Sequence, residues 1–296
     1  MDARSLGQYY TVGNPFKHPA FLEWLQDDLI LEPFAGSKNI VHLVNQGRWD
    51  CYDIDPKAEG VLQRDTLANF PKGYRTVVTN PPYLAKNSAT RRGLPYPSTQ
   101  YNDLYKYALS LMLKHCERVA VIIPLSFLTC KELKDRLSTL IILNYKMFDD
   151  TEVPVCLALF TKEQSDLVLY RGLEKLEVTP FDFKSCKVDM TFNSEKGQLG
   201  LYAIDNQKEA SIHFCKGEGI QVKKSSRSIT RIYSSEFKDL DTLIEKCNRT
   251  LNEYRRMTQD TGLTPFKGLR QDGSYRYRLD YKQARKIIEH ALIESP

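Results

Sequence analysis

One stretch decides the fold of this chain: Arg75-Thr76-Val77-Val78-Thr79-Asn80-Pro81-Pro82-Tyr83. The residues before Asn80 are mostly β-branched, which favours a buried strand. Pro81 and Pro82 lack the N–H group that a strand must donate, so the strand has to end at about Asn80. The sequence therefore predicts a short buried strand that carries Asn80, Pro81, Pro82 and Tyr83 at its carboxyl end.

Similar apolar runs lie on both sides of this strand and alternate with helix-like segments up to about residue 160. The other predicted strands are residues 28–33, 49–53, 118–123 and 157–160, and residues 101–116 have helical spacing. Short apolar strands that alternate with helices indicate an α/β fold, with a mostly parallel sheet covered by helices on both faces. Such sheets bind ligands beyond the carboxyl ends of their strands.

Asn80 to Tyr83 have the chemistry to act on the exocyclic amine of a planar base. Such an amine is a poor nucleophile, because its lone pair is delocalised into the ring. Carbonyl oxygens of the Asn80 side chain and the Pro81 backbone can accept its hydrogens and make the nitrogen more tetrahedral and more nucleophilic. Pro81 and Pro82 fix the backbone there, and Tyr83 offers a flat ring for stacking on the base. Taken alone, this tetrapeptide also fits an ordinary turn after a strand, without a catalytic role.

Other predicted strand ends carry features of a site for a nucleoside-containing ligand. Glu32-Pro33-Phe34-Ala35-Gly36 follows the first strand, and its small residues let the backbone approach a ligand. Asp53 ends the second strand, where an acid is placed to hydrogen-bond a ribose diol. Asp65, in Arg64-Asp65-Thr66-Leu67, can accept from an adenine amine. A lone acid at a strand end is usually a turn former, but these features in this order favour a binding site.

Together these motifs resemble the gamma-ordered adenine-N6 group of the amino-methyltransferases that act on DNA, over about residues 7–162. The resemblance implies a Rossmann-like methyltransferase fold and S-adenosylmethionine as the cofactor. It implies cofactor contacts from Tyr10, Thr11, Glu32, Pro33, Phe34, Ala35, Gly36, Asp53, Ile54, Asp65, Thr66 and Asn80. Asn80, Pro81, Pro82 and Tyr83 match the catalytic motif, and Phe148 lies where the family keeps an aromatic residue that stacks on the target base. Because adenine N6 is unreachable inside a duplex, the expected reaction is methyl transfer to a flipped adenine of double-stranded DNA.

One position departs from the family pattern. The family loop usually carries a second glycine two positions after Gly36, where this chain has Lys38. A side chain at that position would crowd the methionine part of the cofactor, unless the loop takes a different path. Lys38 is the feature that favours a different class of function, a protein that binds the cofactor or DNA without turnover.

A second alternative keeps the chemistry and changes the substrate. The same tetrapeptide occurs in methyltransferases that modify a glutamine amide of release factors, and related tetrapeptides occur in enzymes that methylate an RNA base amine. The glutamine enzymes carry a helical domain before the cofactor loop. Here only about 30 residues precede that loop and over 200 follow Tyr83.

The composition, with 42% apolar and 27% charged residues, is that of a globular protein. No apolar run is long enough to span a membrane, and the N-terminus lacks a signal-peptide pattern. Seven scattered cysteines without a C-x-x-C pair, and five isolated histidines, predict neither disulfides nor a metal site. We therefore expect a cytoplasmic protein of a bacterium or a phage-infected cell, with no metal and no membrane partner.

The pattern weakens after about residue 165, which predicts a catalytic domain, residues 1–165, and a target-recognition region, residues 166–296. Residues 216–296 hold 17 Lys or Arg against 11 Asp or Glu, a basic excess that permits DNA binding. A cognate restriction endonuclease is a second expected partner. The residues predicted to contact DNA are Lys86, Arg91, Arg92, Arg270, Arg276 and Arg278. Lys86, Arg91 and Arg92 lie in residues 84–100, which are predicted to be a mobile loop. The alternative is that this loop is disordered in solvent and does not contact DNA.

Overall fold

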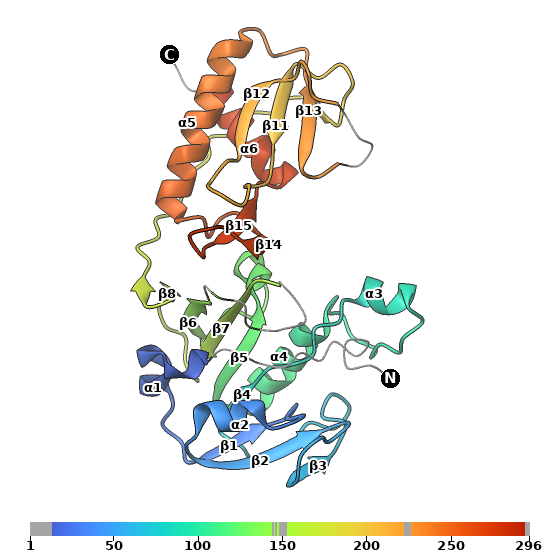
Figure 1. Cartoon of the computed structure of the whole chain (residues 1–296), viewed down its shortest axis with the longest axis vertical. Coiled ribbons are helices and arrows are strands. Elements are labelled where there is room, and N and C mark those ends of the chain that lie inside the picture. The colour runs from blue at the N-terminus through green and yellow to red at the C-terminus, as the bar shows by residue number, and fades with distance from the viewer. Residues whose placement is uncertain (1–13, 144, 146, 148–152, 222–225, 294–296) are drawn as a thin grey trace. The chain divides into compact units, whose positions relative to one another are not determined.

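The computed structural model describes residues 14–143, 145, 147, 153–221 and 226–293. The chain divides into two compact units, Met1–Leu176 and Glu177–Pro296 (Figure 1). This division lies later than the predicted one at residue 165, because two short strands after that point still belong to the first sheet. The strand β8 (Val168–Arg171) pairs in parallel with β6 (Leu137–Ile142), and β9 (Glu174–Lys175) pairs with β8.

The described part of unit 1 contains a nine-stranded sheet in the order β3-β2-β1-β4-β5-β7-β6-β8-β9. The remaining strands are β1 (Leu29–Glu32), β2 (Arg48–Asp53), β3 (Val61–Gln63), β4 (Thr76–Thr79), β5 (Arg118–Pro124) and β7 (Val155–Phe160). The first five strands in the order are parallel, and β7 is antiparallel to both of its neighbours. The chain order reverses between β1 and β4, which makes the crevice beyond their carboxyl ends the expected place for a ligand.

Helices cover both faces of this sheet. On one face, α1 (Pro19–Trp24) and α2 (Asn39–Val44) pack against Val78 and Ile122. Side chains of a strand alternate between faces, so Val77 and Val119, which are fully buried, point to the other face. That face is covered by α4 (Leu104–His115), which contacts β5. The predicted α/β fold, with a mostly parallel sheet and helices on both faces, is confirmed.

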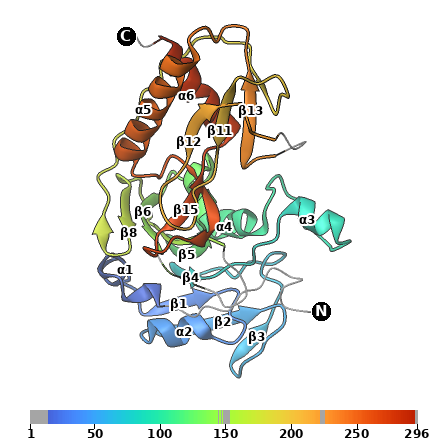
Figure 2. The same cartoon turned by 45° about the horizontal axis from the view of Figure 1, so that its top comes forward.

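The segment predicted as a mobile loop, residues 84–100, contains the helix α3 (Lys86–Arg91), which projects from the sheet (Figure 1, Figure 2). Its base is anchored by apolar contacts: Leu94 and Tyr96 pack against a cluster of Leu84, Ala89 and Leu104. The segment was predicted to be a mobile loop, and the helix within it was not predicted. The basic and polar composition of the segment hid the few apolar residues that hold it.

Unit 2 combines a small antiparallel sheet with two helices and a hairpin. The sheet has the order β10-β13-β11-β12, formed by β10 (Thr191–Phe192), β11 (Leu199–Tyr202), β12 (His213–Lys216) and β13 (Ile229–Tyr233). The helices are α5 (Leu240–Thr258) and α6 (Tyr281–Ile293), and the hairpin is β14 (Thr264–Leu269) with β15 (Tyr275–Arg278). Leu243, Cys247, Leu251 and Tyr254 form the buried stripe of α5, which packs on α6 and β12 (Figure 2).

Two further elements complete the described chain, the 3-10 helices η2 (Pro15–Lys17) and η3 (Leu125–Thr129). Within the described ranges, no helix is long and apolar enough to cross a membrane.

Candidate active site

A cavity of about 550 Å³ lies at the carboxyl ends of β1, β2 and β4 in unit 1. This volume is in the range of small-molecule binding sites. The residues from the strand ends that line it are Glu32, Phe34, Ala35, Gly36, Ser37, Asp53, Ile54, Asp55, Asp65, Thr66, Leu67, Ala68, Asn80 and Pro82. The turn after β1, the end of β2 and the segment after β4 therefore open onto one space at the point where the strand order reverses.

Most residues that the sequence predicts as cofactor contacts lie on this cavity. Pro33 does not line it, but its carbonyl accepts a hydrogen bond from the Thr66 hydroxyl at 2.9 Å. Tyr10 and Thr11 lie outside the described residues, and so does Phe148. The predictions for these three positions stay predictions.

Glu32 is the most deeply buried acid of the cavity, with 1% of its surface exposed. Its Oε1 accepts from the Thr79 hydroxyl and from the Phe34 backbone N–H, the latter at 3.2 Å. Its Oε2 is buried and has no hydrogen-bond partner among the residues with described positions. Burial raises the pKa of Glu32 to about 8, although the bonds from Thr79 and Phe34 act in the opposite direction. The group is therefore largely neutral at pH 7 in this structure.

Asp53 shapes the turn that faces the cavity. Its Oδ2 accepts from the Gly36 backbone N–H and its Oδ1 from the Asp55 backbone N–H, both at 2.8 Å. Burial raises its pKa above the usual value of an aspartate. Gly36 has a φ of +47°, a left-handed conformation that glycine adopts without steric cost. The first turn and the second strand end are thus joined by a direct hydrogen bond.

Lys38 is accommodated by the path of the loop. Its φ is +62°, so it occupies a left-handed position that glycine would take more easily. Its ammonium group donates to the Glu59 carbonyl at 3.0 Å, and its side chain does not line the cavity. The crowding that the sequence suggested at this position is absent from the described cavity wall.

Asp65 forms a turn as well as part of the wall. Its Oδ1 accepts from the backbone N–H groups of Leu67 and Ala68, each at 3.1 Å. This arrangement holds the segment 65–68 against the cavity, where Thr66 is buried. The ordinary role of an acid at a strand end, to cap a turn, and the predicted role as a wall residue occur together here.

The structure separates the four residues of the predicted catalytic motif. Asn80 and Pro82 line the cavity, whereas Pro81 and Tyr83 do not. The Tyr83 hydroxyl lies 2.6 Å from Asn80 Oδ1 and 2.6 Å from the Ile122 carbonyl oxygen. Its ring packs against the core on the α1 and α2 face of the sheet. Tyr83 thus orients the Asn80 amide from behind, and its ring does not face the cavity as a stacking surface.

One wall of the cavity was not foreseen from the sequence. It consists of Leu94, Pro95, Tyr96, Pro97 and Ser98, with Tyr107 of α4 beside it. The Tyr96 hydroxyl donates to the Tyr101 carbonyl at 3.2 Å, and burial raises the pKa of Tyr96 to about 12. An aromatic residue between two prolines inside a polar loop was the signal that could have revealed this wall.

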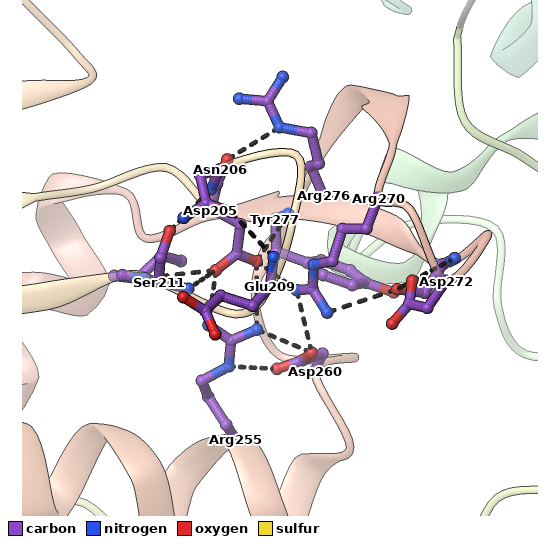
Figure 3. Close-up of polar contacts among 12 residues, drawn as sticks. Asp205, Asn206, Glu209, Ser211, Arg255, Asp260, Arg270, Asp272, Arg276 and Tyr277 are labelled. Carbon is purple, nitrogen blue, oxygen red and sulfur yellow. Dashed lines mark hydrogen bonds and ion pairs between the residues drawn. The ribbon is translucent and has the colours of Figure 1, made fainter.

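The six arginines and lysines predicted to contact DNA have different environments. Lys86, Arg91 and Arg92 are exposed on α3 and at its end. Arg276 and Arg278 are partly exposed on β15. The Arg270 side chain is only 8% exposed and is ion-paired with Asp205 (Figure 3). The prediction of a DNA contact for Arg270 conflicts with this placement, because its guanidinium is already bound inside unit 2.

Several solved structures have a similar arrangement of elements. A modification subunit of a putative type I restriction enzyme from Vibrio vulnificus YJ016 is 14% identical, with 59% of this chain and 48% of that chain covered and a TM-score of 0.40. The type I restriction-modification system methyltransferase subunit from Streptococcus thermophilus is 15% identical, with 60% and 50% covered and a TM-score of 0.42.

A putative class I S-adenosylmethionine-dependent methyltransferase from Listeria monocytogenes is 13% identical, with 51% of this chain and 61% of that chain covered and a TM-score of 0.37. This chain therefore spans about half to three fifths of the length of these three proteins. No family model and no curated protein matches the chain.

Proposed function

We propose that this chain transfers a methyl group from S-adenosylmethionine to N6 of adenine in double-stranded DNA. One observation carries the proposal: Asn80 and Pro82 open onto the same cavity as Gly36 and Asp53. The residues expected to hold a cofactor and those expected to act on an amine are thus neighbours.

The wall residues suit the parts of S-adenosylmethionine. Asp53 lies at the end of β2, where an acid can bind the ribose hydroxyls, and Ile54 beside it is 53% exposed, leaving apolar surface for an adenine ring. Asp65 and Thr66 lie on the same wall. The cofactor would supply the electrophilic methyl group. These residues would bind and orient it.

Asn80 would activate the target amine. Its side-chain oxygen is of the kind that accepts a hydrogen bond from an amine, and the Tyr83 hydroxyl, 2.6 Å from it, holds the amide in place. The sequence also suggests the backbone carbonyl of Pro81 as an acceptor, but Pro81 does not line the cavity, so Asn80 is the acceptor that we propose. Because transfer to nitrogen is direct, most of the acceleration would come from proximity and alignment. The base must leave the duplex to reach the cavity.

The sequence suggested that the Tyr83 ring stacks on the flipped base, and we now propose a different role for Tyr83. Since the Tyr83 ring packs into the core, we assign Tyr83 the role of orienting Asn80. Pro82 lines the cavity and offers a flat apolar face to the base, and Phe148 remains the proposed aromatic partner. Unit 2 and the exposed Lys86, Arg91 and Arg92 would contact the duplex.

The proposed setting is the cytoplasm of a bacterium or a phage-infected cell, in a restriction-modification or anti-restriction role. A cognate restriction endonuclease would then be a partner of the same system.

The test is methyl transfer from tritiated S-adenosylmethionine to duplex DNA, to RNA and to a release factor, assayed side by side. We expect label in duplex DNA, and the position of the methyl group at adenine N6 can be established by digestion and mass spectrometry. Label only in RNA or in the release factor would replace the DNA substrate with that one. Calorimetric cofactor binding without transfer to any substrate would indicate a binding protein.

The Asn80→Ala variant tests the role of the amide. We expect at least about 100-fold slower transfer, similar to the loss of one positioned hydrogen-bonding group in other active sites, with cofactor affinity changed little. Asn252→Ala, which removes an exposed amide from α5, is the matched control and should transfer at the wild-type rate. Full activity of Asn80→Ala would remove the proposed mechanism.

A further inference from the structure

Unit 2 contains a buried group of two acids and two arginines, Asp205, Arg255, Asp260 and Arg270, here called the Asp205 cluster (Figure 3). Asp205 itself is fully buried. Arg255 donates to its two carboxylate oxygens at 2.9 and 3.1 Å, and Arg270 donates to Oδ2. Burial alone would raise the pKa of Asp205, but the bonds from Arg255 and Arg270 outweigh it and leave the pKa below its usual value. The two arginines thus favour the charged form of Asp205.

The cluster joins three segments that are distant in the sequence. Asp205 lies in the connection between β11 and β12, Arg255 near the end of α5, and Arg270 at the turn of the β14–β15 hairpin. The Tyr277 backbone N–H also donates to Asp205 Oδ2, at 3.1 Å. Breaking a buried pair of this kind leaves an uncompensated charge, so the hairpin is held firmly at this point.

Arg276 is held by the same acid but is not part of the cluster. Its Nε donates to the backbone carbonyl of Asp205 at 2.8 Å. Its guanidinium lies 5.2 Å from the ring centre of Phe266, the residue directly opposite on β14. Figure 3 shows the end of the Arg276 side chain pointing away from the Asp205 cluster. The side chain is therefore fixed at Nε and along one flat face, while its terminal nitrogens point outward.

The strand β15 sorts its residues between two faces. Tyr275 and Tyr277 are 4% and 3% exposed and point inward, so Arg276 and Arg278 share the opposite face. Among the described residues, no carboxylate lies within ion-pair distance of Arg276 or Arg278, in contrast to Arg270. An arginine with restricted rotamers and unengaged terminal nitrogens is pre-organised to bind two acceptors of a partner at once.

We infer that this face of the β14–β15 hairpin is a DNA contact surface, on which Arg276 binds the duplex and the Asp205 cluster acts only by positioning Arg276. This inference rests on the proposed function, because duplex DNA is the partner that it assumes. The paired terminal nitrogens of Arg276 fit either two oxygens of a phosphate or the O6 and N7 atoms of guanine. The basic excess of residues 216–296, 17 Lys or Arg against 11 Asp or Glu, suits a polyanionic partner.

The experiment measures the binding of the full chain to a fluorescent duplex by anisotropy at several salt concentrations. Arg276→Ala should weaken binding between about 5-fold and 100-fold, the range for one well-formed bidentate contact. If the contact is to phosphate, the slope of log K against log salt should fall by about 1 for every duplex sequence. If the contact is to guanine, the loss should be confined to duplexes that contain the recognition sequence.

Three further variants separate contact from scaffold. Arg276→Lys keeps the charge but lacks the planar group. We therefore expect its loss in log K, relative to the wild type, to be more than half of the loss seen for Arg276→Ala. Arg270→Ala should lower the melting temperature as well as the affinity, because it disrupts the buried cluster. Arg256→Ala removes an equal charge from a side chain on α5 that is 75% exposed, and should leave affinity within about twofold of the wild type.

Three outcomes would overturn the inference, and they are distinguishable. If the wild type binds and methylates duplex DNA while Arg276→Ala binds as tightly, the inference is overturned and the proposed function stands. If the wild type binds no duplex DNA, the proposed function falls, and the inference falls with it. If the wild type binds RNA more tightly than duplex DNA and Arg276→Ala loses this preference, the hairpin face is a nucleic-acid contact surface, but DNA is the wrong partner.

Discussion

Replacing Glu32 by glutamine should change how the stability of this protein depends on pH. The Glu32 carboxyl group is 1% exposed, accepts two hydrogen bonds at Oε1, and has no described partner at Oε2. This environment raises its pKa to about 8 from the ordinary value of 4.5. The folded protein therefore holds a proton that the unfolded chain releases above about pH 4.5.

The magnitude follows from linkage. A folded-state pKa above the unfolded one means that stability is highest below pH 4.5 and falls as the pH rises towards 8. Each pKa unit corresponds to about 1.36 kcal/mol, so the full shift is worth about 5 kcal/mol as an upper limit. Glutamine does not titrate. It keeps an acceptor for Thr79, but it places an amide N–H₂ where Oε2 has no partner, at a pH-independent cost of about 1–3 kcal/mol.

Urea unfolding of the wild type and of Glu32→Gln at pH 5, 6.5 and 8 measures this difference. We expect the variant to be equal or less stable at pH 5 and more stable at pH 8, with the difference between the two proteins shifting by about 2–5 kcal/mol across that range. Glu23→Gln, an exposed site on α1, is the control and should run parallel to the wild type. Parallel profiles of the wild type and Glu32→Gln would show that Glu32 is ionised when folded and would refute the reasoning.

Two other substitutions test local geometry. Lys38→Gly should raise the free energy of unfolding by up to about 1 kcal/mol, because the backbone at φ +62° strains a lysine. The same variant should keep the cofactor Kd within about threefold of the wild type. Urea unfolding measures the first effect and calorimetry the second, and a loss of cofactor binding would contradict the described path of the loop. Gly262→Ala should destabilise unit 2 by about 1–3 kcal/mol, because the added Cβ would lie 2.1 Å from the Tyr254 hydroxyl oxygen. Thermal unfolding measures this effect, and an unchanged midpoint would show that Tyr254 can move aside freely.

The central strands could be predicted because burial on both faces leaves a continuous apolar run. Residues 76–79 and 118–124 are of this kind, and the structure has β4 and β5 there. The strand β6 was not predicted, because Ser138 and Thr139 interrupt its apolar run and its pairing with β7 shifts register there. The residues of β8, which lies between β6 and the two-residue edge strand β9, are all partly exposed, and such a strand leaves no clear apolar pattern in the sequence.

The site was predictable where function depends on the ends of strands. Asp53 and Asn80 both line one cavity, since parallel strands bring their carboxyl ends to the same edge, and their roles there stay predictions. The environment of Arg270 was not predictable, because its partner Asp205 is 65 residues away in the chain and only the fold brings them together. The orientation of Tyr83 also depends on a distant residue, Ile122, on the neighbouring strand.

The single proton of the Tyr83 hydroxyl has two carbonyl oxygens within reach, one on Asn80 and one on Ile122. A hydroxyl can give that proton to only one of them at a time. The Ile122 carbonyl gives the phenol a main-chain acceptor whose position does not depend on the Asn80 side chain. One phenol thus ties the side chain that follows β4 to the main chain of β5, so the position of Asn80 depends on the packing of two strands rather than on its own turn alone.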